Sequence, residues 1–300
     1  MKLRASLKFA GRLILPKTDK KSSARKSLFG AMICIGLSII PLIVVISITN
    51  GVINGMTERI VNLSSSHLEA FIASGIKQVS SYDNFTAYAE GVKEIEGVTA
   101  SYPEINISAL GAGKTKRTGI EIRAVDKDIF NKNEHFKSLF QVIEGDLAPF
   151  SENAGKTAVV GKKMADELGL HAGDTFKIIT TRSNKGKITP KLTVFKVAAI
   201  ISSGYQELDQ LWVFIPLESA YDYISLRDAS YNVLIETDDA YSPNLIRIQN
   251  RVKKYFGRYA NVYRWEQIHT SEFENFSSTK VKNITIKIWS KGISIGISAK

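Results

Sequence analysis

The feature that most constrains this chain is an uncharged run of 23 residues, Ser27–Thr49, close to its amino terminus. Sixteen of these residues are apolar, so the run is hydrophobic along its whole length. At about 1.5 Å rise per residue, a helix of this length spans roughly 35 Å and crosses a hydrocarbon core of about 30 Å. Pro41 lies inside the run, and membrane helices tolerate such a proline. The run therefore predicts a transmembrane helix.

A cleavable signal peptide is the alternative interpretation of this run. Signal peptides have an apolar stretch of about 7 to 15 residues followed by a small-residue cleavage site. The run here is longer, and no Ala-x-Ala pattern follows Thr49. The sequence therefore favours an uncleaved anchor.

Positive charge on the amino-terminal side of the run predicts its orientation. Residues 1–26 contain nine Lys or Arg and a single acid, Asp19. By the positive-inside rule this tail is expected in the cytoplasm, and the chain after the helix is expected to be exported. The expected location is a bacterial inner (cytoplasmic) membrane, with the main domain extracytoplasmic.

The formal net charge of +11 belongs to the two ends of the chain. Residues 27–275 contain 26 basic and 28 acidic side chains, whereas residues 276–300 contain five Lys and no acid. The body has no excess charge with which to neutralise phosphates, so no nucleic acid is expected as a partner. The single cysteine, Cys34, lies in the apolar run, so the body must be stable without an intramolecular disulfide. An exported domain of this size without cystines favours a bacterial source.

Apolar periodicity continues beyond the membrane. Four residues recur at spacings of four, four and three, which predicts a helical stalk with one apolar stripe: Val52, Met56, Ile60 and Leu63. Alternation and turn residues then predict strands at 67–73, 103–110, 118–125, 157–161, 176–180, 192–201, 212–216 and 231–236. Helices are predicted at 83–96, 162–168, 217–226 and 243–256. Asp83 is the expected N-cap of the first of these and Gly97 its stop, while Gly161 and Gly173 are expected at turns that need positive φ.

This pattern predicts an α+β fold, in which one amino-terminal transmembrane helix precedes a mixed α/β extracytoplasmic domain. A division of the body into two subdomains is expected near residues 126–149. The expected organisation is a basic cytoplasmic tail, a transmembrane helix, a helical stalk, a core domain and a second basic tail, at 1–26, 27–50, 51–66, 67–275 and 276–300.

Motifs that carry chemistry are sparse in this sequence. The four histidines are scattered and none is paired with Glu at metalloprotease spacing, which argues against a zinc hydrolase. The chain contains no nucleophile elbow and no Walker loop. Asp209 is interpreted as a turn or cap residue. No catalytic, cofactor or metal site is therefore expected, and the chain is not expected to be an enzyme.

The sequence nevertheless contains a set of short motifs in a specific order. The motifs are Ser47–Gly51 at the end of the span, Gly119–Asp126, Glu144–Leu147, Val160–Asp174, and Val197–Gly204 with Asp209 and Pro216–Leu217. The motif Val160–Asp174 is the most informative of these. It combines a Gly, a helix of small residues, a Leu-Gly pair and a Gly-Asp pair, and these rarely occur together at these spacings. The order resembles FtsX/MacB-type ABC transporter permeases over residues 1–279, and among them is most similar to the lipoprotein-releasing permeases.

The resemblance implies a MacB-like periplasmic core domain in a non-enzymatic transport subunit without a cofactor. It implies a cytoplasmic ABC ATPase, a like or related permease subunit as dimer partner, and lipoprotein or other apolar-tailed cargo. The ATPase would drive motion of the exported domain with the first helix. The stripe Val52, Met56, Ile60 and Leu63 would then be the lever and would face the cargo.

The resemblance also implies a protruding hairpin that docks a periplasmic carrier in one of the paired permeases. The corresponding stretch, 182–191, has a net charge of +4 and contains Lys185, Gly186, Lys187 and Pro190. From the residues alone, a solvated loop is the alternative interpretation.

The sequence departs from the family pattern after Thr279, where a second span is expected. Residues 280–293 contain four Lys, each opposing insertion by up to about 3 kcal/mol, while each apolar residue favours it by about 0.5 kcal/mol. This segment is therefore not a span, and a truncation or frameshift is expected after Thr279. The alternative function is a single-span, membrane-anchored extracytoplasmic binding or scaffold module without an ATPase. Three further spans and an ATPase gene next door would distinguish the permease from this module.

Overall fold

The computed structural model of the chain describes residues 23–60, 63, 66–114, 116–152, 155–184, 187–268, 284–289 and 292–297. The chain divides into two compact units, Met1–Met56 and Thr57–Lys300.

One long helix, α2 (Ser23–Ile60), contains the predicted transmembrane run. Its segment Phe29–Thr49 is long and apolar enough to cross a membrane, and none of that segment is buried within the protein. The helix continues to Ile60 with Pro41 inside it, as the apolar stripe predicted. An apolar helix without a protein cover is suited to a lipid environment, where its backbone groups are satisfied internally.

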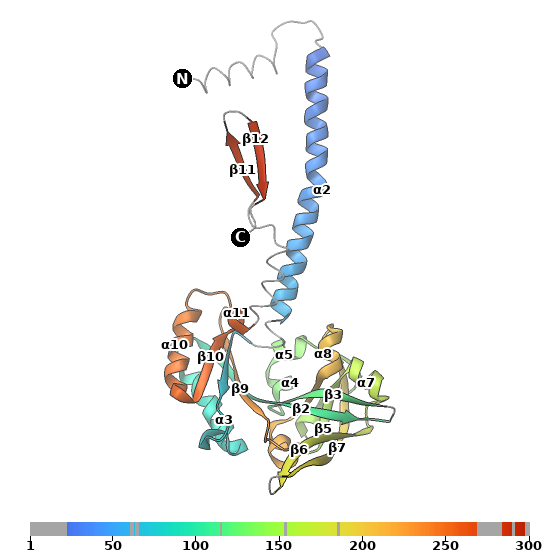
Figure 1. Cartoon of the computed structure of the whole chain (residues 1–300), viewed down its shortest axis with the longest axis vertical. Coiled ribbons are helices and arrows are strands. Elements are labelled where there is room, and N and C mark those ends of the chain that lie inside the picture. Colours follow the sequence, from blue (N-terminus) through green and yellow to red (C-terminus); the bar gives the residue numbers. More distant parts are fainter. Residues whose placement is uncertain are drawn as a thin grey trace. The chain divides into compact units, whose positions relative to one another are not determined.

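Six strands of the second unit close into a barrel. Each pairs with the next in the order β2, β3, β8, β5, β7 and β6, and β6 pairs back onto β2. Their bounds are Val98–Ala112, Arg117–Val125, Trp212–Pro216, Thr157–Gly161, Lys187–Ser202 and Thr175–Asn184. The β3–β8 and β5–β7 pairs are parallel and the other four are antiparallel. Figure 1 shows β2, β3, β5, β6 and β7 gathered on one side of the core.

The sheet extends beyond the barrel at both ends. Strands β9 (Ser230–Thr237), β1 (Leu68–Ile72) and β10 (Ala260–Arg264) continue it from β2. Strand β4 (Gln141–Gly145) pairs with β7 at the other edge. β2 belongs to both parts, because its first half pairs with β9 and its last three residues pair with β6.

This continuity corrects the expected division near residues 126–149. Strands from before that segment pair with strands from after it, since β2 pairs with β9 and β3 pairs with β8. One sheet therefore crosses the expected boundary, and the second unit remains whole.

Two hydrophobic clusters stabilise the second unit. The larger cluster fills the barrel with strand side chains, such as the neighbours Ile122 and Val213 on β3 and β8, and Phe176 on β6. It also includes residues of α7 (Lys162–Leu168). It continues beneath the helices α3 (Tyr82–Glu90) and α10 (Leu245–Phe256). The smaller packs short helices on the outside of the barrel: α4 (Ile129–Lys132), α5 (Glu134–Ser138), α6 (Ala148–Glu152) and α8 (Gln206–Leu211). Edge-to-face and tilted phenylalanine contacts dominate the smaller cluster: Phe130, Phe136, Phe140, Phe150 and Phe214.

The remaining elements are short. They are η2 (Lys77–Val79), η3 (Gly91–Glu94), α9 (Leu217–Tyr223), η4 (Gly257–Tyr259), α11 (Trp265–Ile268) and the antiparallel hairpin β11 (Ile284–Trp289) with β12 (Gly292–Ile297).

Two local predictions were wrong. The N-cap of α3 is Ser81 rather than Asp83, because the Ser81 side chain accepts a hydrogen bond from the backbone N–H of Asn84 at 3.3 Å. Gly161 has φ −64, so it does not need positive φ, whereas Gly173 has φ +88 as predicted. Gly161 is required for another reason: a Cβ there would overlap the backbone carbonyl of Asp209.

Candidate coupling site at the base of the stalk

The apolar stripe meets the core at its last residue. Leu63 is buried in the smaller hydrophobic cluster, beside Ile129 and Phe136. Val52 is exposed on α2. The other two stripe residues, at positions 56 and 60, lie in α2, but their side chains fall outside what the structure describes. Leu63 is thus the stripe residue whose contact with the core is seen.

A buried arginine holds the backbone at this point. Nη1 of Arg123, on β3, donates a hydrogen bond to the Leu63 carbonyl at 2.8 Å. Its Nε and Nη2 both donate to the Glu104 carboxylate at 2.8 Å, and the guanidinium lies 4.4 Å from the ring centre of Trp212. Both charged side chains are almost fully buried. We call Arg123, with its bonds to the Glu104 carboxylate and the Leu63 carbonyl, the arginine fork. Removing either Arg123 or Glu104 would leave an unpaired buried charge. The bond from Arg123 to the carbonyl fixes Leu63 to the sheet.

Ser66 and His67, directly before β1, also bind to the sheet. Ser66 has φ +53, an uncommon value for a residue other than glycine, and its hydroxyl donates to the Ile235 carbonyl at 3.1 Å. Nδ1 of His67 accepts from the Thr237 backbone N–H at 3.0 Å. Leu63, Ser66, His67 and Arg123 form the stalk junction. Its contacts bind Leu63, Ser66 and His67 to the sheet.

The last strand of the core lies beside the first. β1 pairs antiparallel with β10, so Leu68 lies opposite Arg264, and the Trp265 N–H donates to the His67 carbonyl at 3.3 Å. Chain segments nearly two hundred residues apart therefore meet at one end of the sheet.

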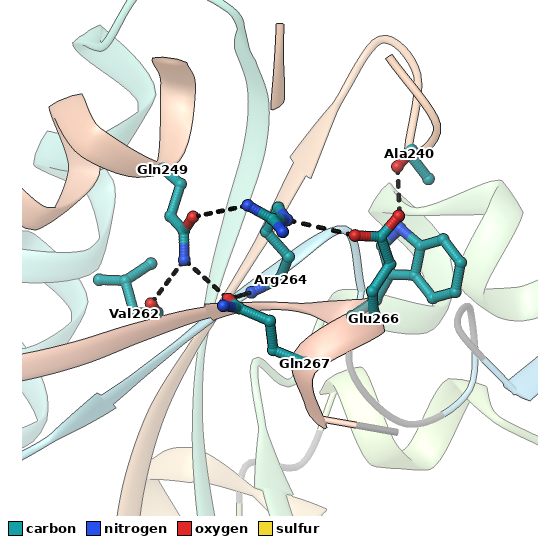
Figure 2. A network of polar contacts seen from close by, with 7 residues as sticks. Ala240, Gln249, Val262, Arg264, Glu266 and Gln267 are labelled. Carbon is teal, nitrogen blue, oxygen red and sulfur yellow. Dashed lines mark hydrogen bonds and ion pairs between the residues drawn. The ribbon is translucent and has the colours of Figure 1, made fainter. Parts of the chain in front are cut away.

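A polar network ties β10 to α10, as Figure 2 shows. The guanidinium of Arg264 contacts Gln249 of α10 at 3.2 Å and Glu266 at 3.3 Å. Nε2 of Gln249 donates to the Val262 carbonyl at 2.9 Å and to the Gln267 side chain at 3.0 Å. The end of the core is therefore held as closely as its beginning.

A second buried acid lies on the same face as the arginine fork. Glu69, on β1, is 5% exposed. Burial raises the pKa of its carboxyl to about 8; the negative charge of Glu104 adds to the rise, and Arg123 opposes it. This carboxyl is therefore largely protonated at neutral pH.

The predicted docking hairpin is present as the β6–β7 pair. Its register runs to Asn184 opposite Lys187, and Pro190 lies opposite Thr181. The predicted docking residues at positions 185 and 186 lie outside the described residues. The strand β7 exposes apolar side chains on one face at alternate positions: Ile188, Leu192 and Val194.

Cations surround the base of this hairpin. A groove of about 580 Å³ is lined by Leu192 and Val194 of this row and by four basic residues: Lys114, Lys116, Arg117 and Lys177. Lys114 also pairs with Asp174 at 2.6 Å. An exposed apolar row beside positive charge suits a partner with an acidic rim and apolar centre.

Asp209 has a structural role, as its sequence position predicted. Its carboxylate accepts hydrogen bonds from the Ser202 hydroxyl and the Ser203 backbone N–H, both at 2.7 Å. Within the described residues, no group of three or more His, Cys, Asp or Glu is placed to hold a metal ion.

The sequence prediction that Leu63 faces the cargo was wrong, because its side chain is buried in the smaller hydrophobic cluster. Sequence reasoning placed a hairpin at the right position but missed the arginine fork. Glu104 and Arg123 alternate with apolar residues in their strands, which is also the pattern of a solvated sheet face. A buried ion pair can be told from a solvated face only by knowing which residues of β2 and β3 lie opposite each other, and the sequence does not show that register.

Comparison with known proteins decides the family. Residues 28–250 match the family described as "MacB-like periplasmic core domain". The chain belongs to this family. Its core is therefore the non-catalytic extracytoplasmic domain of an FtsX/MacB-type ABC transporter permease, anchored to the membrane by one apolar helix.

Solved structures that match this chain come from several bacteria. The periplasmic region of MacB from Actinobacillus actinomycetemcomitans is 12% identical with a TM-score of 0.45, covering 72% of this chain and 96% of that one. The extracellular domain of the noncanonic ABC-type transporter YknZ from Gram-positive bacteria is 14% identical with a TM-score of 0.42, covering 66% and 99%. A domain of a permease protein from Porphyromonas gingivalis is 11% identical with a TM-score of 0.36, covering 65% and 85%.

Proposed function

We propose that this MacB-like chain couples a cytoplasmic ABC ATPase to motion of its exported domain, and that the transporter moves lipoproteins within or out of the inner membrane. The observation that carries the coupling is the arginine fork, in which one buried guanidinium bonds both the Leu63 carbonyl and the core carboxylate of Glu104. A displacement of the stalk would be passed to the sheet through these bonds and through the buried Leu63 side chain.

Two features support an apolar-tailed cargo and an exported carrier. The span and Val52 expose apolar side chains, and a lipid tail gains about 0.8 kcal/mol for each methylene kept out of water. The β6–β7 hairpin, with Lys185, Gly186, Lys187 and Pro190 near its tip, would dock the carrier. Its exposed apolar row and basic groove support that role. The proposed assembly contains a like or related permease subunit as dimer partner.

Purification of the transporter through a tag on this chain tests the coupling function. From native membranes in mild detergent, an ATPase subunit should co-elute and its ATP turnover should be inhibited by vanadate. Reconstituted into liposomes, the complex should release a palmitoylated lipopeptide in an ATP-dependent manner. The double variant E104Q/R123Q, which removes both charges together, should keep the ATPase bound and lower lipopeptide release per ATP hydrolysed.

Two results would count against this function. Recovery of the chain without any ATPase would favour the membrane-anchored binding or scaffold module. Equal release per ATP by the wild type and E104Q/R123Q would show that the arginine fork does not carry the coupling.

A further inference from the structure

β10 is an edge strand of the core sheet, because its one neighbour among the described strands is β1. In an antiparallel pair, alternate residues turn their backbone N–H and C=O groups toward the neighbouring strand and away from it. The Trp265 N–H, directly after β10, donates to the His67 carbonyl at 3.3 Å, so the odd-numbered residues bond on the β1 side. The backbone groups of Val262 and Arg264 therefore point to the open edge.

Two glutamine side chains occupy that edge, as Figure 2 shows. Nε2 of Gln249, on α10, donates to the Val262 carbonyl at 2.9 Å. Oε1 of Gln267, on α11, accepts from the Arg264 backbone N–H at 3.0 Å and from Nε2 of Gln249 at 3.0 Å. The Arg264 guanidinium contacts Oε1 of Gln249 at 3.2 Å, which orients the amide with its N–H groups toward the strand. The two side chains thus give the edge one donor and one acceptor, as a neighbouring strand would.

The packing of α10 does not explain a polar residue at position 249. Gln249 is 3% exposed and lies on the buried side of the helix with three apolar residues: Leu245, Val252 and Phe256. A leucine would fill this position without the cost of burying an amide. The hydrogen bonds that Gln249 makes at the edge of β10 offset that cost.

β10 lacks the other devices that keep an edge strand from pairing with another chain, which include proline, lysine and bulges. Its sequence, ANVYR, contains neither proline nor lysine, and its register with β1 is continuous. Its one charged side chain, Arg264, bonds back to Gln249 and Glu266. By contrast β4, at the other edge of the sheet, has a bulge between Val142 and Glu144. Without the two glutamines, the edge of β10 would be open.

We propose that Gln249 and Gln267 form an edge cap that keeps β10 from pairing with β10 of a second copy of this chain. Every copy offers the same edge, and two antiparallel copies of one strand pair about a two-fold axis, which closes the interface. Such pairing about Val262 would place Arg264 of one copy opposite Ala260 of the other, so the like charges stay apart. The cap leaves other surfaces to make any contact between copies. It does not rest on the coupling proposed above, since it concerns contacts within the core alone.

The double variant Q249L/Q267L tests the cap in the full chain, purified in detergent. The change at 249 keeps an apolar contact with the core, while the Val262 carbonyl and the Arg264 N–H lose their partners. Light scattering should show species of twice the wild-type mass as the protein concentration is raised, whereas the wild-type mass stays constant. Adding N261K, which places a lysine in the middle of the edge strand, should restore the wild-type mass. The matched control N250L, which places a leucine on the exposed side of α10, should also keep it.

Amide hydrogen exchange of residues 260–264 shows whether the strand itself pairs. At low protein concentration, the Arg264 N–H should exchange up to about tenfold faster in the double variant than in the wild type, because its acceptor is gone. At high concentration it should be protected again by the second copy. Q267A changes an exposed side chain with little risk to folding and should have the same two effects.

The edge cap is overturned if the folded double variant, checked by circular dichroism, has the wild-type mass at every concentration. It is also overturned if N250L associates equally, or if N261K does not reverse the association, because another surface would then be responsible. If the double variant does not fold, Q267A decides the question by the same two measurements, and an unchanged mass overturns the cap.

Discussion

Replacing Glu69 by Gln should stabilise the core domain at neutral and alkaline pH. The folded-state pKa of this carboxyl is raised from 4.5 to about 8. Protonation therefore favours the folded state: the full contribution of Glu69 to stability is present below pH 4.5 and is lost as the pH rises through 8. Each pH unit in that window lowers the free energy of unfolding by up to about 1.4 kcal/mol. At pH 7 the loss amounts to roughly 3 kcal/mol, which E69Q avoids because the amide has the same shape and no charge.

Urea unfolding of the full chain in detergent, followed by tryptophan fluorescence, measures this effect. The wild type should lose stability between pH 5 and 8, and E69Q should lose less by about 1.4 kcal/mol per pH unit. The conservative change E207Q, at an exposed carboxyl on α8 that does not act on Glu69, is the matched control and should follow the wild type. Parallel stability curves for the wild type and E69Q would refute the reasoning, because they would show that Glu69 is ionised in the folded protein.

Other changes have equally definite outcomes. Gly161→Val should lower the free energy of unfolding by about 2 to 3 kcal/mol, since its side chain would overlap a backbone carbonyl of α8; an unchanged urea midpoint would contradict this packing. Arg123→Met should cost about 3 to 5 kcal/mol in the same assay because it leaves Glu104 buried and unpaired, and R123M/E104Q should recover most of that loss. Leu192→Asp should lower lipopeptide release to an added carrier several-fold, whereas Ile246→Asp, a similarly exposed apolar position on α10, should not; equal effects would argue against docking at the hairpin.

Local signals in the sequence correctly predicted the first and last residues of several elements. The bounds of β5, α7 and β8 agree with the prediction. Each has clear ends: Gly161 separates β5 from α7, and Gly169, with φ +65, caps α7. Pro216 ends β8. The alternation on either side of the Gly/Lys-rich connection likewise predicted the pairing of β2 with β3.

The rest depends on contacts that are distant in sequence. The barrel closes through only three residue pairs between β2 and β6, and no periodicity reports them. The helices α4, α5, α6 and α8 have four to six residues, too few to show a helical period. The arginine fork at Arg123 also depends on contacts that are distant in sequence. A charged residue that alternates with apolar ones in a strand gives the same pattern whether its face of the sheet is solvent-exposed or buried.

The pairing of β1 with β10 brings the two ends of the core sheet side by side. Neighbouring strands lie about 4.8 Å apart, so the start of β1 at Leu68 and the end of β10 at Arg264 are separated by about one strand spacing. A domain with adjoining ends closes a short gap in its host at little entropic cost and leaves the flanking segments free to pack as neighbours. The region between Leu68 and Arg264 therefore has the geometry of a module whose two ends can be joined to different flanking segments without a change in its sheet.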